Sequence, residues 1–392
     1  MSVTAAQGFT AAGIAAGLKE NGNPDLALVV NNGPRLAAAG VFTSNRVKAA
    51  PVVWSEQVLK GGTVSAVVLN SGGANACTGP LGFQDTHATA EKAAEVLGHN
   101  AGEVAIASTG LIGLRLPMDK LLPGVERAAA ELTEHGGEKA AIAIKTTDSV
   151  HKTAQVTVGD TTRPQAGGGW TVGGMAKGAG MLAPGLATML VVLTTDADLP
   201  AADLDTALRD ATRTTFDRVD SDGCMSTNDT VLLLASGASG VVPDTAAFAE
   251  AVRTVCADLA RQLIGDAEGA SKDIRIEVVG AAGEDDAVEV GRSIARNNLL
   301  KCAIHGEDPN WGRVLSAIGT TSAVFEPDQL NVAINDVWVC KNGSVGEDRD
   351  LVDMRYREVR ITADLAAGTE SAVIWANDLT ADYVHENSAY SS

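Results

Sequence analysis

The stretch GGMAKGAGMLAPGLATML, residues 173–190, is the most unusual part of this sequence. Its glycines end abruptly at a strand-like apolar run that contains Thr188. The pattern alone favours a flexible loop entering a buried strand, with Thr188 as an ordinary β-branched strand residue. The alternative is a strained junction at which the Thr188 hydroxyl attacks the carbonyl group of Ala187.

This alternative would explain how the Thr188 hydroxyl could be activated as a nucleophile. A threonine hydroxyl is a weak nucleophile, and no Ser/His/Asp grouping in the sequence is evident to activate it. If cleavage exposed Thr188 as a new chain start, its α-amine, with a pKa of about 7.7–8, would be partly neutral at cytoplasmic pH. That amine could serve as the base for the adjacent hydroxyl. The small residues Gly185 and Ala187 would leave room for the attack.

The segments before this stretch predict an α/β protein (α+β), in which sheets are layered with helices. Short apolar runs of strand length occur at 26–30, 64–69 and 104–107, and the last two lead into Asn-Ser-Gly-Gly and Ser-Thr-Gly turns. Glycine and alanine are abundant, whereas aromatic residues make up only 4% of the chain. This composition suits close packing of sheets against helices.

The segments after it predict two helices and then a small strand-rich lobe. One helical apolar stripe has Asp244 as its expected N-cap and Gly265 as its stop, and it consists of Phe248, Val252, Val255, Leu259 and Leu263. A second helix is marked by Leu204, Leu208 and Ala211. The last third instead alternates apolar and polar residues, around 330–339 and 359–365, as strands do.

Composition narrows the classes of function. The 392 residues carry 49 Asp and Glu against 30 Lys and Arg, a net charge of −19, which disfavours partners such as nucleic acid or an anionic membrane. An anionic substrate therefore requires a locally positive binding site. The N-terminal residues lack the charged start and Leu-rich run of a secretory signal, and no apolar run could span a bilayer, so we expect a cytoplasmic protein.

Familiar catalytic and metal-binding signatures are missing. The five cysteines form no C-x-x-C pair, and the six histidines show no metal-ligand spacing. There is also no G-x-S-x-G elbow, P-loop or complete G-x-G-x-x-G. We therefore expect reduced cysteines, no metal and no bound cofactor.

The residues around Thr188 resemble the processing site of the ornithine acetyltransferase family. The resemblance rests on Lys177-Gly178-x-Gly180-Met181-x-x-Pro184 followed by Ala187-Thr188-Met189-Leu190, and it extends over nearly the whole chain. Further similar blocks occur in order at 40–43, 70–76, 108–113, 226–230 and 305–313.

The resemblance implies a self-processing acyltransferase with a fold like that of N-terminal-nucleophile enzymes. Cleavage between Ala187 and Thr188 would give an α chain, 1–187, and a β chain, 188–392, in an α2β2 assembly. In the β chain, 188–280 would complete the catalytic core and about 281–392 would form the C-terminal lobe. Acetyl would pass from N-acetylornithine through Thr188 to glutamate in arginine biosynthesis. Some members of the family also accept acetyl-CoA.

The resemblance also implies the site residues. Thr188 would be the nucleophile, with Thr109 and Gly110 as the oxyanion hole. The substrate-binding positions besides Thr188 would be Thr146, Lys177, Glu268, Asn387 and Ser392. Lys177 would attract the α-carboxylate common to both substrates, and Glu268 the side-chain ammonium of ornithine.

Two departures from the family pattern stand out. The chain ends in Ser392 where relatives usually carry threonine, so the hydroxyl is kept and the methyl group lost. Cys224-Met225 stand where relatives often have Asp-Thr. We interpret the block 226–230 as structural or near the site and assign it no role. The block 305–313 is diagnostic of the family, but its residues suggest a structural turn at Pro309 rather than a role in the chemistry.

Two other functions remain open at this point. One is an N-terminal-nucleophile aminopeptidase or amidase, although a threonine at 188 and the two-substrate site residues argue against a hydrolase. The other is an unprocessed amino-acid-binding or regulatory protein, in which Thr188 is only a strand residue.

Overall fold

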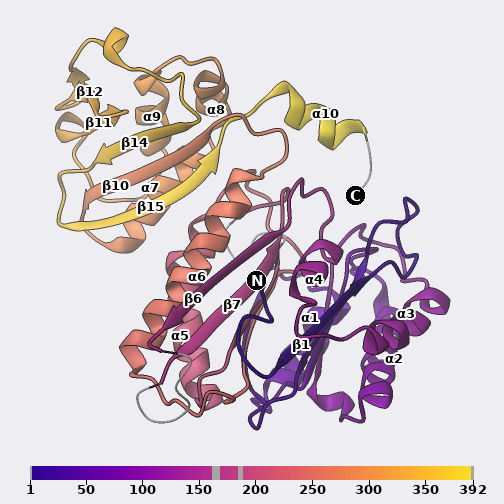
Figure 1. Ribbon diagram of the computed structural model, residues 1–392. Coiled ribbons are helices and arrows are strands. Elements are labelled where there is room, and N and C mark those ends of the chain that lie inside the picture. The colour runs from indigo at the N-terminus through magenta and orange to yellow at the C-terminus, as the bar shows by residue number, and fades with distance from the viewer. Residues whose placement is uncertain (1, 161–167, 184–188, 390–392) are drawn as a thin grey trace.

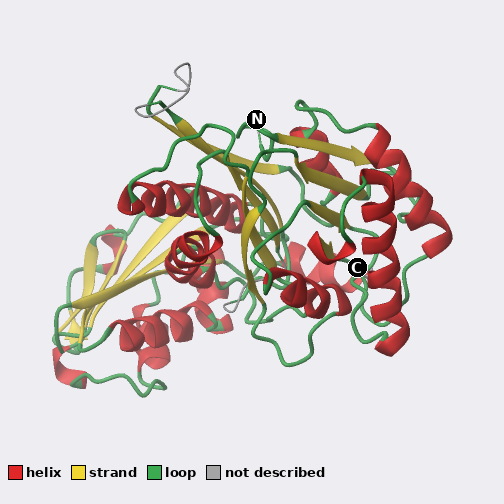
Figure 2. Cartoon of the chain, turned by 90° about the horizontal axis from the view of Figure 1, so that it is seen from below, coloured by secondary structure: helices red, strands yellow, loops and turns green. Residues whose placement is uncertain are grey.

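The computed structural model describes residues 2–160, 168–183 and 189–389, and it has an α/β architecture with three sheets (Figure 1). Two of these sheets face each other and helices cover their outer sides. The third sheet belongs to a separate lobe in the last third of the chain. Figure 2 shows strands in the interior with helices outside them. The predicted layering of sheets and helices is confirmed.

The first sheet is built from the N-terminal third. Its four strands run in the order β1-β2-β4-β5, with bounds β1 Phe9–Ile14, β2 Leu26–Asn31, β4 Ala66–Asn70 and β5 Val104–Ser108. The three apolar runs predicted as strands correspond to β2, β4 and β5. The outer face of the sheet packs against α2 (Gly79–Leu97) and α3 (Met118–Ala130) through a continuous apolar cluster.

The second sheet contains the strands that precede and follow Thr188 in the sequence. Its order is β3-β9-β8-β7-β6, with bounds β3 Ala37–Phe42, β6 Lys152–Val158, β7 Trp170–Lys177, β8 Leu190–Thr195 and β9 Thr230–Ala235. Strands β7 and β8 pair antiparallel, so that Lys177 lies opposite Leu190. Every residue of β7, β8 and β9 is buried because both faces of this sheet are covered.

One face of the second sheet packs against the first sheet, and its other face packs against helices. Met175, Leu190 and Val192 join the cluster shared with the first sheet, which also takes in α4 (Gly137–Ala143). The opposite face packs on α5 (Ala201–Thr214) and α6 (Thr245–Gly265). A further helix, α1 (Ala50–Leu59), lies beside β5.

Helix α6 forms as its sequence predicts. The Asp244 side chain caps it by accepting hydrogen bonds from the amides of Ala246 and Ala247, at 3.0 and 3.1 Å. The whole predicted apolar stripe is buried. Gly265, the expected stop, is the last residue of the helix, and Asp266 is its C-cap.

The C-terminal lobe has its own sheet and its own core. The strand order is β13-β12-β11-β14-β10-β15, with bounds β10 Asp273–Ala281, β11 Asn331–Ile334, β12 Val337–Lys341, β13 Ser344–Val345, β14 Glu358–Asp364 and β15 Glu370–Asn377. The sheet packs on α7 (Glu284–Ala295), α8 (Asn298–His305) and α9 (Trp311–Ile318). The predicted strand-rich character is confirmed. The lobe was expected to begin at about 281, but its sheet already includes β10, which starts at Asp273.

The last helix, α10 (Ala381–Ala389), extends from the lobe back over the core (Figure 1). Gly269 makes this contact possible, since its φ is +62° and a Cβ there would lie 2.2 Å from the backbone nitrogen of Tyr383. The Thr380 hydroxyl donates to the carbonyl oxygen of Gly269 at 2.6 Å. The start of α10 is therefore attached to the segment that follows α6.

We expect Gly269→Ala to detach α10. The left-handed φ alone costs an alanine about 1–2 kcal/mol, and the methyl group would also overlap the backbone of Tyr383. Thermal unfolding should begin at a lower temperature, and protease should cut within 381–389 sooner. Gly265→Ala, four residues earlier with open space around its Cβ, is the matched control. Equal behaviour of the two variants would contradict this role of Gly269.

Candidate active site

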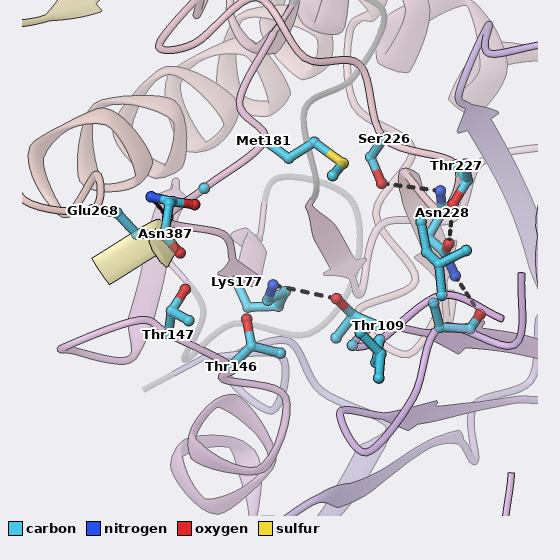
Figure 3. A pocket seen from close by; sticks show the side chains of 15 residues that line it. Thr109, Thr146, Thr147, Lys177, Met181, Ser226, Thr227, Asn228, Glu268 and Asn387 are labelled. Atoms are coloured by element: carbon cyan, nitrogen blue, oxygen red, sulfur yellow. Dashed lines mark hydrogen bonds between the residues drawn. The ribbon is translucent and has the colours of Figure 1, made fainter. Parts of the chain in front are cut away.

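A pocket of about 210 Å³ lies where the two facing sheets meet α10 (Figure 3). Its lining brings together six of the predicted site residues, namely Thr109, Gly110, Thr146, Lys177, Glu268 and Asn387. In Figure 3, Glu268 and Asn387 lie on one side, Thr109 and Asn228 on the other, and Lys177 between them. Ala187, Thr188 and Ser392, the remaining predicted residues, lie outside the described residues.

The turn after β5 presents a backbone donor to this pocket. Its conformation is set by hydrogen bonds from the Thr109 amide to the Asn70 carbonyl oxygen, at 3.0 Å, and from the Gly73 amide to the Thr109 carbonyl oxygen, at 3.1 Å. Gly110 has a φ of +132°, and a Cβ there would lie 2.8 Å from the Gly73 nitrogen. Within the described part of the chain, no group accepts the Gly110 N–H. This donor is available to a ligand.

Lys177 places a cation at the centre of the pocket. It is the last residue of β7, its side chain is only 2% exposed, and its Nζ donates to the Thr109 hydroxyl at 3.4 Å. Burial lowers the pKa of Lys177, and the negative charge of Asp148 opposes that shift. A buried ammonium of this kind attracts an anionic group, although the protein as a whole is acidic.

Asp148 organises the backbone around Lys177. Its Oδ1 accepts hydrogen bonds from the Lys152 ammonium and the Gly178 amide, both at 2.6 Å. Its Oδ2 accepts the amide of Thr146 at 3.0 Å. Burial by itself would raise the pKa of the Asp148 carboxyl, but Lys177, Lys152 and the Gly178 amide together hold it far below its usual value. Asp148 therefore stays ionised.

A second ion pair completes this buried group. Lys152, which is fully buried, also donates to the Asp266 carboxylate at 2.6 Å. Asp266 lies just beyond α6, whereas Lys152 begins β6. The network thus joins the loop that carries Thr146 to the segment that carries Glu268, and buried charges joined in this way are costly to break.

Glu268 contributes a carboxylate to the pocket, opposite in charge to the Lys177 ammonium, and Asn387 contacts it. The Asn387 side-chain amide donates to Glu268 Oε2 at 2.9 Å, and the Glu268 amide donates to the Ala179 carbonyl oxygen, also at 2.9 Å. Gly180 is required here, because a Cβ would lie 2.5 Å from the Glu268 carboxyl group. The carboxylate is thereby held 8% exposed at the pocket wall.

Sequence reasoning assigned no role to several residues that line the pocket. These are Ala74, Leu111, Ile112, Thr147, Gly180, Met181, Ser226, Thr227 and Asn228. Asn228 has the most specific contacts, since its amide donates to the carbonyl oxygens of Ala74 and Ser108 at 2.6 and 2.8 Å. The signal was present in the block at 226–230, which resembles the family and was interpreted as structural or near the site. Its partners are more than a hundred residues away, so only the fold reveals them.

The described residues offer neither a metal centre nor a membrane span. Over 2–160, 168–183 and 189–389, no three His, Cys, Asp or Glu side chains gather as metal ligands would. In the same ranges, no helix combines the length and apolar character needed to cross a bilayer.

The geometry suits reaction at the carbonyl group of a small zwitterion. Lys177 can bind a carboxylate, Glu268 can bind an ammonium group, and the Gly110 N–H with the Thr109 hydroxyl can stabilise an oxyanion. The positive and negative groups lie in one small pocket, which favours an amino acid over a singly charged ligand.

Comparison with known proteins identifies close relatives. The sequence model of the ArgJ family matches residues 10–392. The arginine biosynthesis bifunctional proteins ArgJ of Streptomyces avermitilis and Streptomyces coelicolor are 85% and 81% identical, and each match covers all of both chains. A crystal structure of ornithine acetyltransferase from Mycobacterium tuberculosis, complexed with ornithine, is 57% identical, with a TM-score of 0.43, over 48% of this chain and 96% of that one.

We expect Asp148→Asn to move the alkaline limit of carboxylate binding to lower pH. Lys177 attracts an anion only while it is protonated, and the charge of Asp148 raises the Lys177 pKa that burial lowers. Without that charge the Lys177 pKa falls further, so the ammonium loses its proton at a lower pH. Isothermal titration with glutamate across the neutral and alkaline range measures the shift.

Lys177→Met is the matched control and should bind glutamate weakly at every pH. An alkaline limit that stays in place, or rises, in the Asp148→Asn variant would contradict the proposed coupling.

Proposed function

This chain belongs to the ArgJ family, and from that premise we propose that it is a glutamate N-acetyltransferase of arginine biosynthesis. It moves the acetyl group of N2-acetyl-L-ornithine to L-glutamate and yields L-ornithine and N-acetyl-L-glutamate. The observation that carries the proposal is one pocket of about 210 Å³ whose lining combines the Lys177 ammonium, the Glu268 carboxylate and Gly110. Lys177 would hold the α-carboxylate of either substrate, and Glu268 the ammonium of ornithine.

The enzyme matures by cutting itself before Thr188. The Thr188 hydroxyl attacks the Ala187 carbonyl carbon, its proton passes to the departing Thr188 nitrogen, and an ester replaces the peptide bond. Water then hydrolyses this ester. The products are a carboxylate at Ala187 and a Thr188 that has both a free hydroxyl and a free α-amine. The amine supplies the base that the site otherwise lacks.

Acetyl transfer then takes two matched half-reactions. Thr188 attacks the acetyl carbonyl of N-acetylornithine, its α-amine takes the hydroxyl proton and passes it to the leaving nitrogen, and ornithine departs. The amine of glutamate attacks the acetyl-Thr188 ester and regenerates the hydroxyl. Each tetrahedral intermediate places a negative oxygen by the Thr109 hydroxyl and the Gly110 N–H, and one such donor is worth about 2.7–4 kcal/mol.

Contacts across the junction support a stable pair of fragments after cleavage. Strand β7 lies before Thr188 and β8 after it, and the two pair over six residues each. Asn228 of the later fragment donates hydrogen bonds to Ala74 and Ser108 of the earlier one. The α chain, 1–187, and the β chain, 188–392, therefore stay joined without a peptide bond. The proposal includes their α2β2 assembly, the role of Ser392 in substrate binding and a cytoplasmic location, all of which the family resemblance implied.

The comparisons favour acetyl transfer over the aminopeptidase or amidase that the sequence left open, since curated relatives at 85% and 81% identity are arginine biosynthesis proteins. They also speak against a scaffold that only binds amino acids. The relatives' description as bifunctional fits a second acetyl donor, and we include acetyl-CoA as that donor.

We expect a donor–acceptor matrix to establish the reaction. Purified protein should transfer acetyl from N-acetylornithine to glutamate and from N-acetylglutamate to ornithine, and chromatography of the products measures both rates. Acetyl-CoA with glutamate tests the second activity. Free acetate released at one rate with or without glutamate would instead identify a hydrolase.

We expect Thr188→Ala to remain a single chain with no transfer activity, because both steps use the Thr188 hydroxyl. Thr188→Ser keeps a hydroxyl and should cleave and turn over, though more slowly. Denaturing gels and N-terminal sequencing follow cleavage, and the acetyl-transfer assay follows activity. A Thr188→Ala chain that was cut at the same bond would contradict self-processing.

A further inference from the structure

One loop, residues 220–230, contacts the chain on both sides of the junction at 184–188. On the later side, Asp229 Oδ1 accepts the Met189 amide at 3.0 Å, and the Thr230 amide donates to the Met189 carbonyl oxygen at 3.1 Å. On the earlier side, Asp222 Oδ2 accepts the Met181 amide at 2.8 Å, and the Ser221 amide donates to Leu182 at 2.5 Å. We call residues 220–230 the junction loop.

The later contact is made by an unusually placed carboxyl group. Asp229 is completely buried, and its Oδ2 finds no hydrogen-bond partner among the described residues. Burial raises the pKa of Asp229 well above its usual value, although the Met189 amide, the Ser226 hydroxyl and the charge of Lys177 lower it. An incompletely paired buried carboxyl is costly. Its hydrogen bond to Met189, the residue after Thr188, suggests a functional reason for that cost.

The earlier contact restrains a strained backbone. Met181 has a φ of +56°, a left-handed conformation that is rare for a bulky side chain. The bond to Asp222 fixes its amide in this conformation. Backbone strain of this kind persists where the surroundings enforce it, and it concentrates at functional sites.

The junction loop is in turn fixed by the C-terminal lobe. Arg296 Nε donates to Asp220 Oδ2 at 2.7 Å, and the Lys301 ammonium donates to the Ser221 carbonyl oxygen. Lys301 is 4% exposed and Asp220 is fully buried. The loop is therefore a rigid support, attached to the lobe on one side and to both flanks of the junction on the other.

We propose that the junction loop is a clamp for self-processing, in which Asp222 and Asp229 are positioning residues that hold the two flanks of the Ala187–Thr188 bond. The inference rests on the cleavage proposed above. Fixing both flanks limits the motion of the chain between them, and reactions between groups in one chain accelerate strongly when their geometry is restricted.

The two contacts have different uses after cleavage. The Asp222 contact holds Met181, which lies near the end of the α chain and in the lining of the pocket. The Asp229 contact holds Met189, which remains bonded to the nucleophile Thr188. Of the two contacts, the Asp229 contact is therefore the one that holds a residue bonded to the nucleophile after cleavage.

Cell-free synthesis of the full chain, sampled over time on denaturing gels, tests the clamp. Asp222→Ala and Asp229→Ala should each slow conversion to the two fragments by about tenfold or more, the effect of losing one buried hydrogen bond. Asp229→Asn keeps an acceptor for the Met189 amide and should recover most of the rate. Once fully cleaved, Asp229→Ala should show a larger loss of kcat than Asp222→Ala.

Asp196→Ala is the matched control. Asp196 is also a buried carboxyl that accepts two backbone amides, but it follows the other end of β8. Its loss should lower the unfolding temperature and leave the cleavage rate unchanged. Cleavage of both Asp222→Ala and Asp229→Ala at the wild-type rate, or slowing no greater than that of Asp196→Ala, would overturn the clamp and leave the acetyltransferase proposal standing. A wild-type chain that never cleaves would overturn both.

Discussion

The antiparallel pairing of β7 with β8 is the constraint on which the rest of the structure depends. It brings Lys177 and Leu190 opposite each other and closes the glycine-rich stretch between them into one connection. Because both strands are buried on both faces, their register cannot shift without exposing apolar side chains or burying polar ones. A cut in the connection removes no ladder hydrogen bond. The fold can therefore lose a peptide bond at its centre and keep its shape.

The same pairing leaves Lys177 only 2% exposed, and the surrounding charges follow from that position. A lone buried ammonium would lose its proton, so the structure surrounds it with ionised groups. Asp148 provides the nearest negative charge, and Lys152 and Asp266 extend the network to β6 and the end of α6. An acidic protein thereby keeps one protected cation in its pocket. In the proposed function, this network keeps Lys177 charged for an amino-acid carboxylate.

The C-terminal lobe contributes to the site although its own core is separate. It fixes the junction loop through Arg296 and Lys301, and it carries α10 back so that Asn387 contacts Glu268. Gly180 and Gly269 make these close approaches possible, since a side chain at either position would overlap the group that arrives. Gly180, which belongs to the stretch that the sequence pattern favoured as a loop, and Gly269 are thus points of contact between distant segments.

Local pattern was sufficient for much of the fold. Helix α6 and its Asp244 cap, the strands β2, β4 and β5, and the alternation in the lobe all follow from the periodicity of apolar side chains and from capping chemistry, which act over a few residues. The motifs also pointed to Thr109, Gly110, Thr146, Lys177, Glu268 and Asn387 as site candidates.

Tertiary structure alone decided how these parts combine. The sequence contains Asn228, Asp148 and Asp229 as ordinary polar residues, and nothing near them in the chain says that Asn228 reaches Ser108 or that Asp229 reaches Met189. Hydrogen bonds such as these, between residues that lie 40 and 120 positions apart, depend on how sheets stack and how a lobe docks. Those arrangements are set by burial of apolar surface over the whole molecule, and no short stretch encodes them. The sequence by itself determined which residues could do the chemistry, and the packing of the layers decided which of them meet.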